Sequence, residues 1–384
     1  MKSCKIGIIG FGGFGKFLYN SWSKLENVNI IAIADLDAEK AKGGDNIEAF
    51  TNWRELLKIK DIDLIAIVTT PDQHQEMAIA CMEAGKHVLI EKPLATSLPD
   101  AEEIIQARDR THRVAGIDFM MRFNPMLQSL QQFTQNGTFG KLRRVDVENY
   151  AQDESLPISH WFWNPDRSGG ILVEHGVHFI DLVHFLSPSK PVFVSGLRYK
   201  RNSQQEDQFM ANVVYRDGLM ATHYHSFSRP GFFENTKIKL AFDLADLELH
   251  GWMPLWADVR VLVNPETKST LLNDPLFEMS ASIPLSQLED ESRPKGWGVT
   301  ENNRSDDGHR IRSGGITYQG TEMVVGKFLT RRLKQEVYVN CVQASLLDLI
   351  KKIADPSHKL TASLETGLAS LEIAIQATKS ARGI

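Results

Sequence analysis

The first thirty-five residues constrain the fold of this chain more than any other stretch. An apolar run ends at Gly10, glycines recur at positions 12 and 15, and a helical pattern follows at once. This spacing predicts a strand, a tight turn and a helix. Gly10 permits the turn, Gly12 lets a pyrophosphate approach the backbone, and Gly15 lets the helix pack close to the sheet. The free N–H groups that begin the helix would face the phosphates.

Asp35 ends the next apolar run, where a carboxylate can accept hydrogen bonds from the ribose hydroxyls of an adenosine. No Lys or Arg stands between Asp35 and Lys40, which favours NAD over NADP. The alternative is a glycine turn in an α/β protein that binds no nucleotide. The residues expected to contact the cofactor here are Gly10, Gly12, Gly13, Phe14, Gly15 and Asp35.

Strand and helix patterns alternate up to about residue 122, which predicts a doubly wound parallel sheet. Ligands of such sheets bind beyond the carboxyl ends of the strands. Thr69, Thr70, Glu91 and Lys92 all stand at such ends. Lys92 is either an ordinary surface lysine or, at the mouth of a nucleotide site, a group that stabilises negative charge on a substrate oxygen.

A different pattern begins after residue 122, so we expect two domains, 1–122 and 123–384. Runs that read as strands predict an α+β domain with a large, mostly antiparallel open sheet. Asp217-Gly218 is a hairpin signal between two of them. We expect a polar excursion over 264–314, which is an ordered lid, an oligomer arm or a mobile loop. Two helices follow, a broken one over 321–354 and another over 360–382. The uncovered sheet face predicts a homodimer or homotetramer.

Composition excludes several classes of protein. The chain has 384 residues, a formal net charge of −5 and no long basic run, so nucleic acid is not an expected partner. Three widely separated cysteines argue against a disulfide framework and for a reducing compartment. No apolar run reaches membrane-spanning length and the N-terminus does not resemble a signal sequence. These features predict a cytoplasmic protein without a membrane partner.

The stretch from Gly169 to Leu186 reads as an amphipathic helix. Glu174 and His178 are four residues apart on it, so we expect the carboxylate to orient the imidazole and raise its basicity. Such a pair can take a proton from a carbon-bound hydroxyl. Gly176, between them, suggests that a ring approaches the backbone there. The alternative is a buried histidine that a neighbouring acid satisfies.

A metal site is the competing interpretation of this stretch. Glu174, His175 and His178 lie close in sequence, and His223 and His225 share a strand face. Adjacent helical residues point about 100° apart, however, and the spacing is not compact, so we expect no metal. The aromatic cluster from His160 to Trp163 is either core or a wall against which a sugar ring packs.

These residues resemble the glucose–fructose oxidoreductase / inositol dehydrogenase (Gfo/Idh/MocA) family over nearly the whole chain. The resemblance rests on the glycine turn with Asp35 and on motifs around His74, Glu91-Lys92-Pro93, Arg122 and Glu174-x-Gly-x-His178. It implies a Rossmann domain, an open-sheet domain, dimers or tetramers, and oxidation or reduction of a carbon of a sugar, polyol or inositol with NAD(P).

The resemblance also implies roles for individual residues. Lys92 and His178 would be the catalytic pair, with Glu174 where the family usually has Asp. Met121, Arg122 and His175 would face substrate, to which we add His160 and Trp163 from the aromatic cluster. Thr69, Thr70, His74 and Glu91 would line the cofactor. The glutamate at 174 and the long 264–314 segment depart from the family pattern.

We therefore expect an NAD(P)-dependent dehydrogenase that acts on CH–OH groups of a sugar, polyol or inositol-like substrate. A non-catalytic NAD-bound sensor on the same scaffold is one alternative. The other is tightly held NAD used for a redox-neutral elimination or glycoside hydrolysis.

Overall fold

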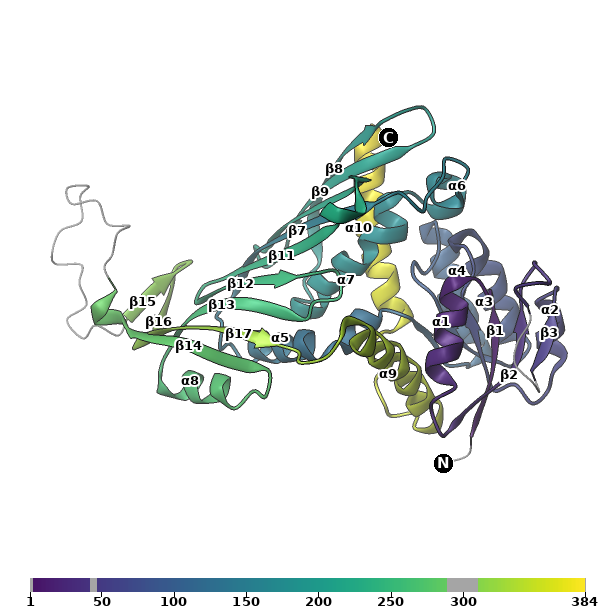
Figure 1. Ribbon diagram of the computed structural model, residues 1–384, viewed down its shortest axis with the longest axis horizontal. Helices are drawn as coiled ribbons and strands as arrows, with labels where there is room; N and C mark the ends of the chain where they lie inside the picture. Colours follow the sequence, from purple (N-terminus) through teal and green to yellow (C-terminus); the bar gives the residue numbers. More distant parts are fainter. Residues whose placement is uncertain (1–2, 42–46, 289–309, 384) are drawn as a thin grey trace.

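Two large sheets lie side by side in the computed structural model, which describes residues 3–41, 47–288 and 310–383 (Figure 1). The first is parallel, with strand order β3-β2-β1-β4-β5-β6. Its strands are β1 Cys4–Ile9, β2 Val28–Ala34, β3 Glu48–Phe50, β4 Leu64–Ile67, β5 His87–Ile90 and β6 Ala115–Ile117. This order confirms the predicted Rossmann sheet, whose ligand crevice lies where the order reverses at β1 and β4.

Helices cover both faces of the parallel sheet. They are α1 Gly13–Trp22, α2 Arg54–Lys58, α3 His74–Glu83 and α4 Leu98–Thr111, with a 3₁₀ turn, η1 Pro71–Gln73, before α3. All four residues of β4 are buried, as a strand covered on both faces requires. The connection to the second domain runs through η2 Met120–Phe123 and α5 Pro125–Gln135.

The second sheet has nine strands, in the order β14-β17-β13-β12-β11-β7-β10-β9-β8. They are β7 Leu142–Gln152, β8 Pro191–Lys200, β9 Glu206–Tyr215, β10 Met220–Arg229, β11 Asn235–Phe242, β12 Ala245–His250, β13 Trp256–Val263, β14 Phe277–Pro284 and β17 Glu322–Leu329. Only β7 and β10 pair in parallel, so the mostly antiparallel sheet is confirmed. Asp217 and Gly218 form the turn between β9 and β10, with Gly218 at φ 89°.

Helices lie against one face of this sheet (Figure 1). Between β7 and β8 come η3 Trp161–Trp163, α6 Pro165–Ser168, the π-helical turn η4 Leu172–Gly176 and α7 Val177–Leu186. The remaining short elements are η5 Gly231–Phe233, α8 Pro265–Leu272, η6 Leu285–Gln287 and the hairpin β15 Arg310–Ser313 with β16 Ile316–Gln319.

The last two helices join the two domains. In α9 Lys334–Ala354, the Val342 carbonyl accepts a 2.9 Å hydrogen bond from Trp22 Nε1 of α1. Next, α10 Leu364–Arg382 runs along β8, where a Cβ on Gly196 would lie 2.1 Å from the Ala377 carbonyl oxygen. Only glycine permits that approach. No helix among the described residues is long and apolar enough to cross a membrane.

Two sequence interpretations of the C-terminal half are wrong. The segment expected as a helix from 321 begins with β17, and the helix starts only at Lys334. The excursion from 264 contains α8 and the edge strand β14, which pairs with β17. Both errors share a cause: β14 and β17 are partners far apart in sequence, so neither reads as a strand alone. Residues 289–309 of the excursion lie outside the described residues.

Candidate active site

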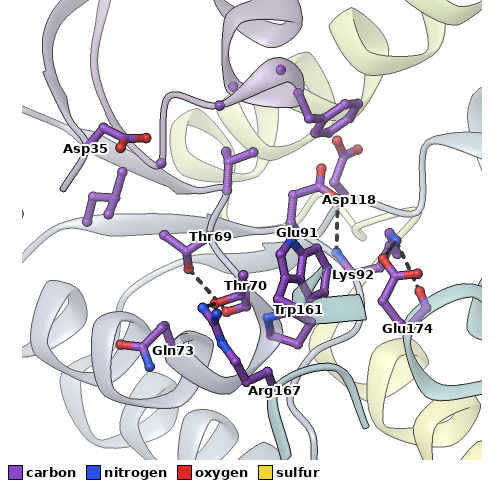
Figure 2. A pocket seen from close by; sticks show the side chains of 18 of the residues that line it. Asp35, Thr69, Thr70, Gln73, Glu91, Lys92, Asp118, Trp161, Arg167 and Glu174 are labelled. Carbon is purple, nitrogen blue, oxygen red and sulfur yellow. Dashed lines mark hydrogen bonds and ion pairs between the residues drawn. The ribbon is translucent and has the colours of Figure 1, made fainter. Parts of the chain in front are cut away.

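A cavity of about 910 Å³ lies beyond the carboxyl ends of the parallel strands, and both domains line it (Figure 2). The glycine turn and Asp35 line one part. Lys92, Glu174, His175 and His178 line another, the last three from the second domain. The fold thus brings residues separated by more than eighty positions into one cavity.

The glycine turn has the shape that a dinucleotide phosphate requires. Gly10 adopts φ +92°, and a Cβ there would lie 2.3 Å from the Val68 carbonyl oxygen. A Cβ on Gly15 would lie 2.1 Å from the Gly10 oxygen, whereas Cβ atoms on Gly12 and Gly13 would meet nothing within 4 Å. The turn is therefore closed toward the protein and open toward the cavity, at the N-terminus of α1, which carries no acid in its first turn.

Asp35 stands at the end of β2, remote from Lys92 in Figure 2. Its Oδ2 accepts a 2.8 Å hydrogen bond from the Phe11 amide and its Oδ1 a 2.9 Å bond from the Asp37 amide. The carboxylate therefore also braces the glycine turn. Lys40, another lining residue, lies 3.5 Å from the Asp37 carboxylate.

Lys92 and Glu174 form an ion pair between the domains. Lys92 Nζ donates to Glu174 Oε1 at 2.7 Å and to the Glu174 carbonyl oxygen at 3.0 Å. Burial alone would raise the pKa of Glu174, but the Lys92 charge, His175 and the hydrogen bond lower it below its ordinary value. The carboxylate therefore stays ionised and holds the lysine toward the second domain.

His178 lies beside this ion pair, not in hydrogen-bond contact with Glu174. The expected Glu174–His178 bond is absent among the contacts of the described residues, because the π-helical turn changes the helical spacing and Lys92 takes the carboxylate. Burial, and then Lys92, lowers the pKa of His178 well below its ordinary value. Its Nδ1 is buried without a partner. The imidazole is thus neutral, with a free ring nitrogen.

His175 also faces the cavity. Its Nε2 lies 3.0 Å from Asn149 Oδ1, and Asn149 Nδ2 donates to Thr236 Oγ1 at 2.7 Å. Because that amide oxygen only accepts, Nε2 of His175 carries the proton. Burial lowers the pKa of His175 to about 4. His175 is therefore a fixed, neutral polar group in the wall of the cavity.

Several residues expected to face ligand do not reach the cavity. Arg122 is buried against Asp181, with bonds of 2.8 and 2.7 Å, and Met121 is 2% exposed. Neither lines the cavity. His74 is fully buried, with Nδ1 2.8 Å from the Pro93 carbonyl oxygen and Nε2 3.3 Å from that of Thr69. It braces the loops that carry Thr69 and Lys92.

The aromatic cluster is divided between two cavities. Trp161 lines the main one, while His160 and Trp163 line a separate cavity of about 340 Å³.

Gly176 does not lie where a ligand ring could approach the backbone, contrary to the expectation. A Cβ there would meet Leu172, at 2.4 Å, and His225 Nε2, at 3.5 Å, so this glycine serves packing inside the second domain.

Sequence reasoning missed other lining residues, among them Asp118, Met120, Asn149, Trp161, Arg167, Trp252 and Tyr338. Asp118 follows β6 directly, so the strand-end rule that found Lys92 could have found it. Arg167 donates to Thr70 Oγ1 at 3.2 Å across the two domains. Tyr338 comes from α9, and no local pattern connects it with the site.

Within residues 3–41, 47–288 and 310–383, no three His, Cys, Asp or Glu side chains are grouped so that they could hold a metal ion. His223 and His225 are buried behind α7, with ring centroids 6.4 Å apart. The described residues thus offer the phosphate turn, the interdomain ion pair and the neutral imidazole as candidate site chemistry.

A doubly wound nucleotide-binding domain that faces a nine-stranded open sheet across such a cavity defines a class of two-domain oxidoreductases. Residues 4–119 match the profile of an oxidoreductase family with an NAD-binding Rossmann fold, and residues 127–241 match the C-terminal domain profile of the same Gfo/Idh/MocA family. The chain belongs to this family.

Characterised relatives resemble the chain only distantly. A myo-inositol 2-dehydrogenase of Thermotoga maritima is 26% identical over 47% of this chain and 54% of its own length. An inositol 2-dehydrogenase/D-chiro-inositol 3-dehydrogenase of Lactiplantibacillus plantarum is 25% identical over 76% of this chain and 86% of its own. For several relatives the match spans only about half to two thirds of their length.

The fold is shared with solved structures. An oxidoreductase from Agrobacterium radiobacter, in complex with NAD⁺, L-tartaric acid and magnesium, superimposes with a TM-score of 0.73 at 15% identity. The match covers 99% of this chain and 97% of that one. At this identity the likeness shows the fold alone.

Proposed function

We propose that this protein is an NAD-dependent dehydrogenase that oxidises or reduces a hydroxyl-bearing carbon of a sugar, polyol or inositol-like substrate. The observation that carries the proposal is the convergence of Lys92 and His178, from different domains, in the cavity that the glycine turn and Asp35 also line. Relatives named as inositol dehydrogenases support the substrate class.

The residues of the cavity fit a dinucleotide. The open backbone at Gly12 and Gly13 would hold the pyrophosphate, and Asp35 would hold the adenosine ribose. The acceptor groups at Asp35 and the absence of any Lys or Arg before Lys40 favour NAD over NADP. A bound nicotinamide supplies or accepts the hydride.

Two side chains of the protein would act on the hydroxyl group that loses its proton. The Lys92 ammonium hydrogen-bonds the reacting oxygen and stabilises negative charge as the hydroxyl proton leaves. Neutral His178, with its unpartnered ring nitrogen, accepts that proton. Glu174 holds the lysine by its carboxylate and its carbonyl oxygen, which makes Glu174 a positioning residue for Lys92.

Removing either member of the pair tests this proposal. Lys92→Met and His178→Asn should each lower kcat by about 10²- to 10⁴-fold, because each removes a group that acts on the reacting oxygen or its proton. NAD affinity, measured by calorimetry, should change by less than about 3-fold. Arg167→Lys, which alters another polar lining residue, serves as the comparison for general damage to the cavity.

The first assay is a screen of inositols, polyols and sugars for NADH formation at 340 nm. Turnover with one NADH per product supports a dehydrogenase. Turnover without net NADH would identify redox-neutral chemistry, and NAD binding without turnover on any of these substrates would favour a sensor. Full activity of both variants would refute the assigned roles.

A further inference from the structure

The inner wall of the cavity carries two adjacent carboxyl groups at the ends of neighbouring strands. Ile90 of β5 pairs with Ile117 of β6, so Glu91 and Asp118 leave the sheet side by side. The Asp118 amide donates to the Ile90 carbonyl oxygen at 2.8 Å, which fixes this register. Figure 2 shows both side chains at the Lys92 end of the cavity, away from Asp35.

Most oxygens of this pair make no well-formed hydrogen bond with the chain. Asp118 is 1% exposed and Glu91 8% exposed. Both Asp118 oxygens and Glu91 Oε1 are buried and make no hydrogen bond of good geometry, although Ser345 of α9 and the neighbouring carboxyl lie within reach of Asp118. Glu91 Oε2 accepts from the Lys92 amide at 3.2 Å. Buried carboxyl oxygens are unfavourable without donors. These atoms therefore suit a ligand that brings N–H groups into the cavity.

The charge of the pair suits such a ligand as well. Burial, and then the neighbouring Asp118, raises the pKa of Glu91 well above its ordinary value, and burial also raises that of Asp118. Two adjacent buried carboxyls of this kind oppose each other's ionisation, so a donor that approaches either of them is favoured. The Lys92 charge acts on the pair from the cavity side, and Tyr338, Cys341 and Ser345 of α9 face it.

Aromatic rings stand next to the pair. Tyr338 and Phe14 both line the cavity, with nearly parallel rings whose centroids are 6.2 Å apart, and Trp252 meets Tyr338 edge-on at 5.3 Å. Carboxyl oxygens without a well-formed hydrogen bond, beside aromatic surfaces, match a flat heteroaromatic ring that carries a primary amide. The proposed cofactor has one such group, at the end opposite its adenosine.

We propose that Asp118, together with Glu91, is the acceptor site for the carboxamide NH₂ of the nicotinamide ring. The inference rests on the proposed NAD binding and extends it to Asp118, which lies outside the motifs that carry the family resemblance. A hydrogen bond from the carboxamide to this pair fixes the rotation of the ring. It thereby fixes which ring face is presented to Lys92 and the substrate.

Three ligands separate this role from general effects on the cavity. NAD carries the carboxamide, 3-acetylpyridine adenine dinucleotide carries a methyl ketone without N–H donors, and ADP-ribose lacks the ring. Asp118→Ala should weaken NAD binding by about 10- to 100-fold, the loss expected for a hydrogen bond to a charged group. Binding of the other two should change by less than about 3-fold.

Two further variants sharpen the measurement, which is made by calorimetry. Asp118→Asn keeps the size and one acceptor, so it should lower the preference for NAD over the acetylpyridine analogue by about 3- to 10-fold. If Asp118→Ala does not fold, the ligand preference of Asp118→Asn decides whether Asp118 binds the carboxamide. Asp35→Ala, at the adenosine end, should weaken all three ligands by a similar factor.

The inference and the proposed function fail in different ways. If the wild type binds NAD and ADP-ribose but the Asp118 variants weaken all three ligands equally, or none, the carboxamide role is wrong and NAD binding stands. If the wild type binds neither NAD nor ADP-ribose, the proposed function is wrong and this inference with it.

Discussion

At the scale of single residues, the roles of the Lys92–Glu174 ion pair and of the His178 imidazole differ from those expected from the sequence. Glu174 was expected to raise the basicity of His178, but its carboxylate is bound to Lys92. The base strength of His178 is set by burial and by the Lys92 charge, which both favour the neutral form. His178 thus stays unprotonated, because the Glu174 carboxylate binds Lys92 and does not stabilise a protonated imidazole.

This arrangement predicts the acid limb of the activity profile. A protonated imidazole cannot accept a proton, and the lowered pKa keeps His178 neutral below its ordinary value of 6.5. The limb of kcat/KM that His178 controls should therefore have its midpoint below pH 6.5. The check is a pH series from 4.5 to 9 on wild type and His178→Asn. A midpoint at or above 6.5 that vanishes in the variant would contradict the neutral-base role.

Residue positions were predictable where a local rule fixed them. Asp35 and Lys92 end buried strands, and the strand-end rule placed both at the cavity. The rule applied equally to Asp118, which sequence reasoning overlooked. Arg122 and His74 were assigned by resemblance, yet each is turned into the protein by a partner, Asp181 or the Pro93 carbonyl. Such partners come from distant segments that no local pattern reveals.

At the scale of elements, the packing of α7 on β10 buries a row of imidazoles. His223 and His225 of β10 are 0% exposed, and the ring nitrogens of both lack partners. The rings of His175 and His225 lie 5.5 Å apart. The charge of His184, on α7, lowers the pKa of His223. Asp146, on the neighbouring strand β7, has the opposite effect and raises the pKa of His223. Burial lowers the pKa of His223 to about 4.

This row predicts that acid destabilises the fold. Between pH 6.5 and 4 the unfolded chain binds a proton at position 223 and the folded chain does not, so stability falls as the pH falls. His223→Leu should remove about 3 kcal/mol of the loss in unfolding free energy between pH 8 and pH 4. Urea unfolding across this range measures it.

The matched control is His112→Asn, since His112 is exposed and its φ of 53° suits asparagine. This variant should keep the wild-type dependence of stability on pH. If His223→Leu shows the same pH dependence as His112→Asn, His223 is not the group responsible.

Strands β14 and β17 were not predicted, for a reason visible in β17. Its Gly326 reads as a break, but a Cβ there would lie 2.4 Å from the Glu278 carbonyl oxygen of β14, so the strand requires glycine. The partner strand lies about fifty residues earlier, in a segment that looked irregular. The parallel sheet was predictable because its strands are apolar throughout, and α1 follows its glycine turn directly.

At the scale of the whole molecule, the nine-stranded sheet has two unlike faces. Figure 1 shows α5, α7 and α10 along one of them. On the opposite face Phe193, Leu197, Tyr199 and Met220 are 57, 65, 58 and 55% exposed. The register of β8, β9 and β10 puts Phe193 and Met220 in one row, with Val214 between them, while Leu197 and Tyr199 lie further along β8. Ion pairs such as Lys237–Glu248 occupy the neighbouring strands.

An apolar patch of this kind on an open sheet fits an interface between copies of the chain. We therefore predict a homodimer or homotetramer at micromolar concentration. Leu197→Glu should shift the assembly to monomer and raise its dissociation constant by at least about 100-fold, because it buries an unpaired carboxylate in the interface. Light scattering coupled to size-exclusion chromatography measures both species. Leu36→Glu, at a leucine that is 90% exposed but lies beside Asp35 in the cavity, should leave the assembly unchanged.

The same variant separates assembly from catalysis. The patch lies on the face of the sheet opposite α7, which carries His178, so a monomeric Leu197→Glu variant should retain NAD affinity within about 3-fold. A wild type that remains monomeric at micromolar concentration would refute the interface outright. An oligomer that survives Leu197→Glu would place the interface elsewhere, and the exposed patch would then need another explanation.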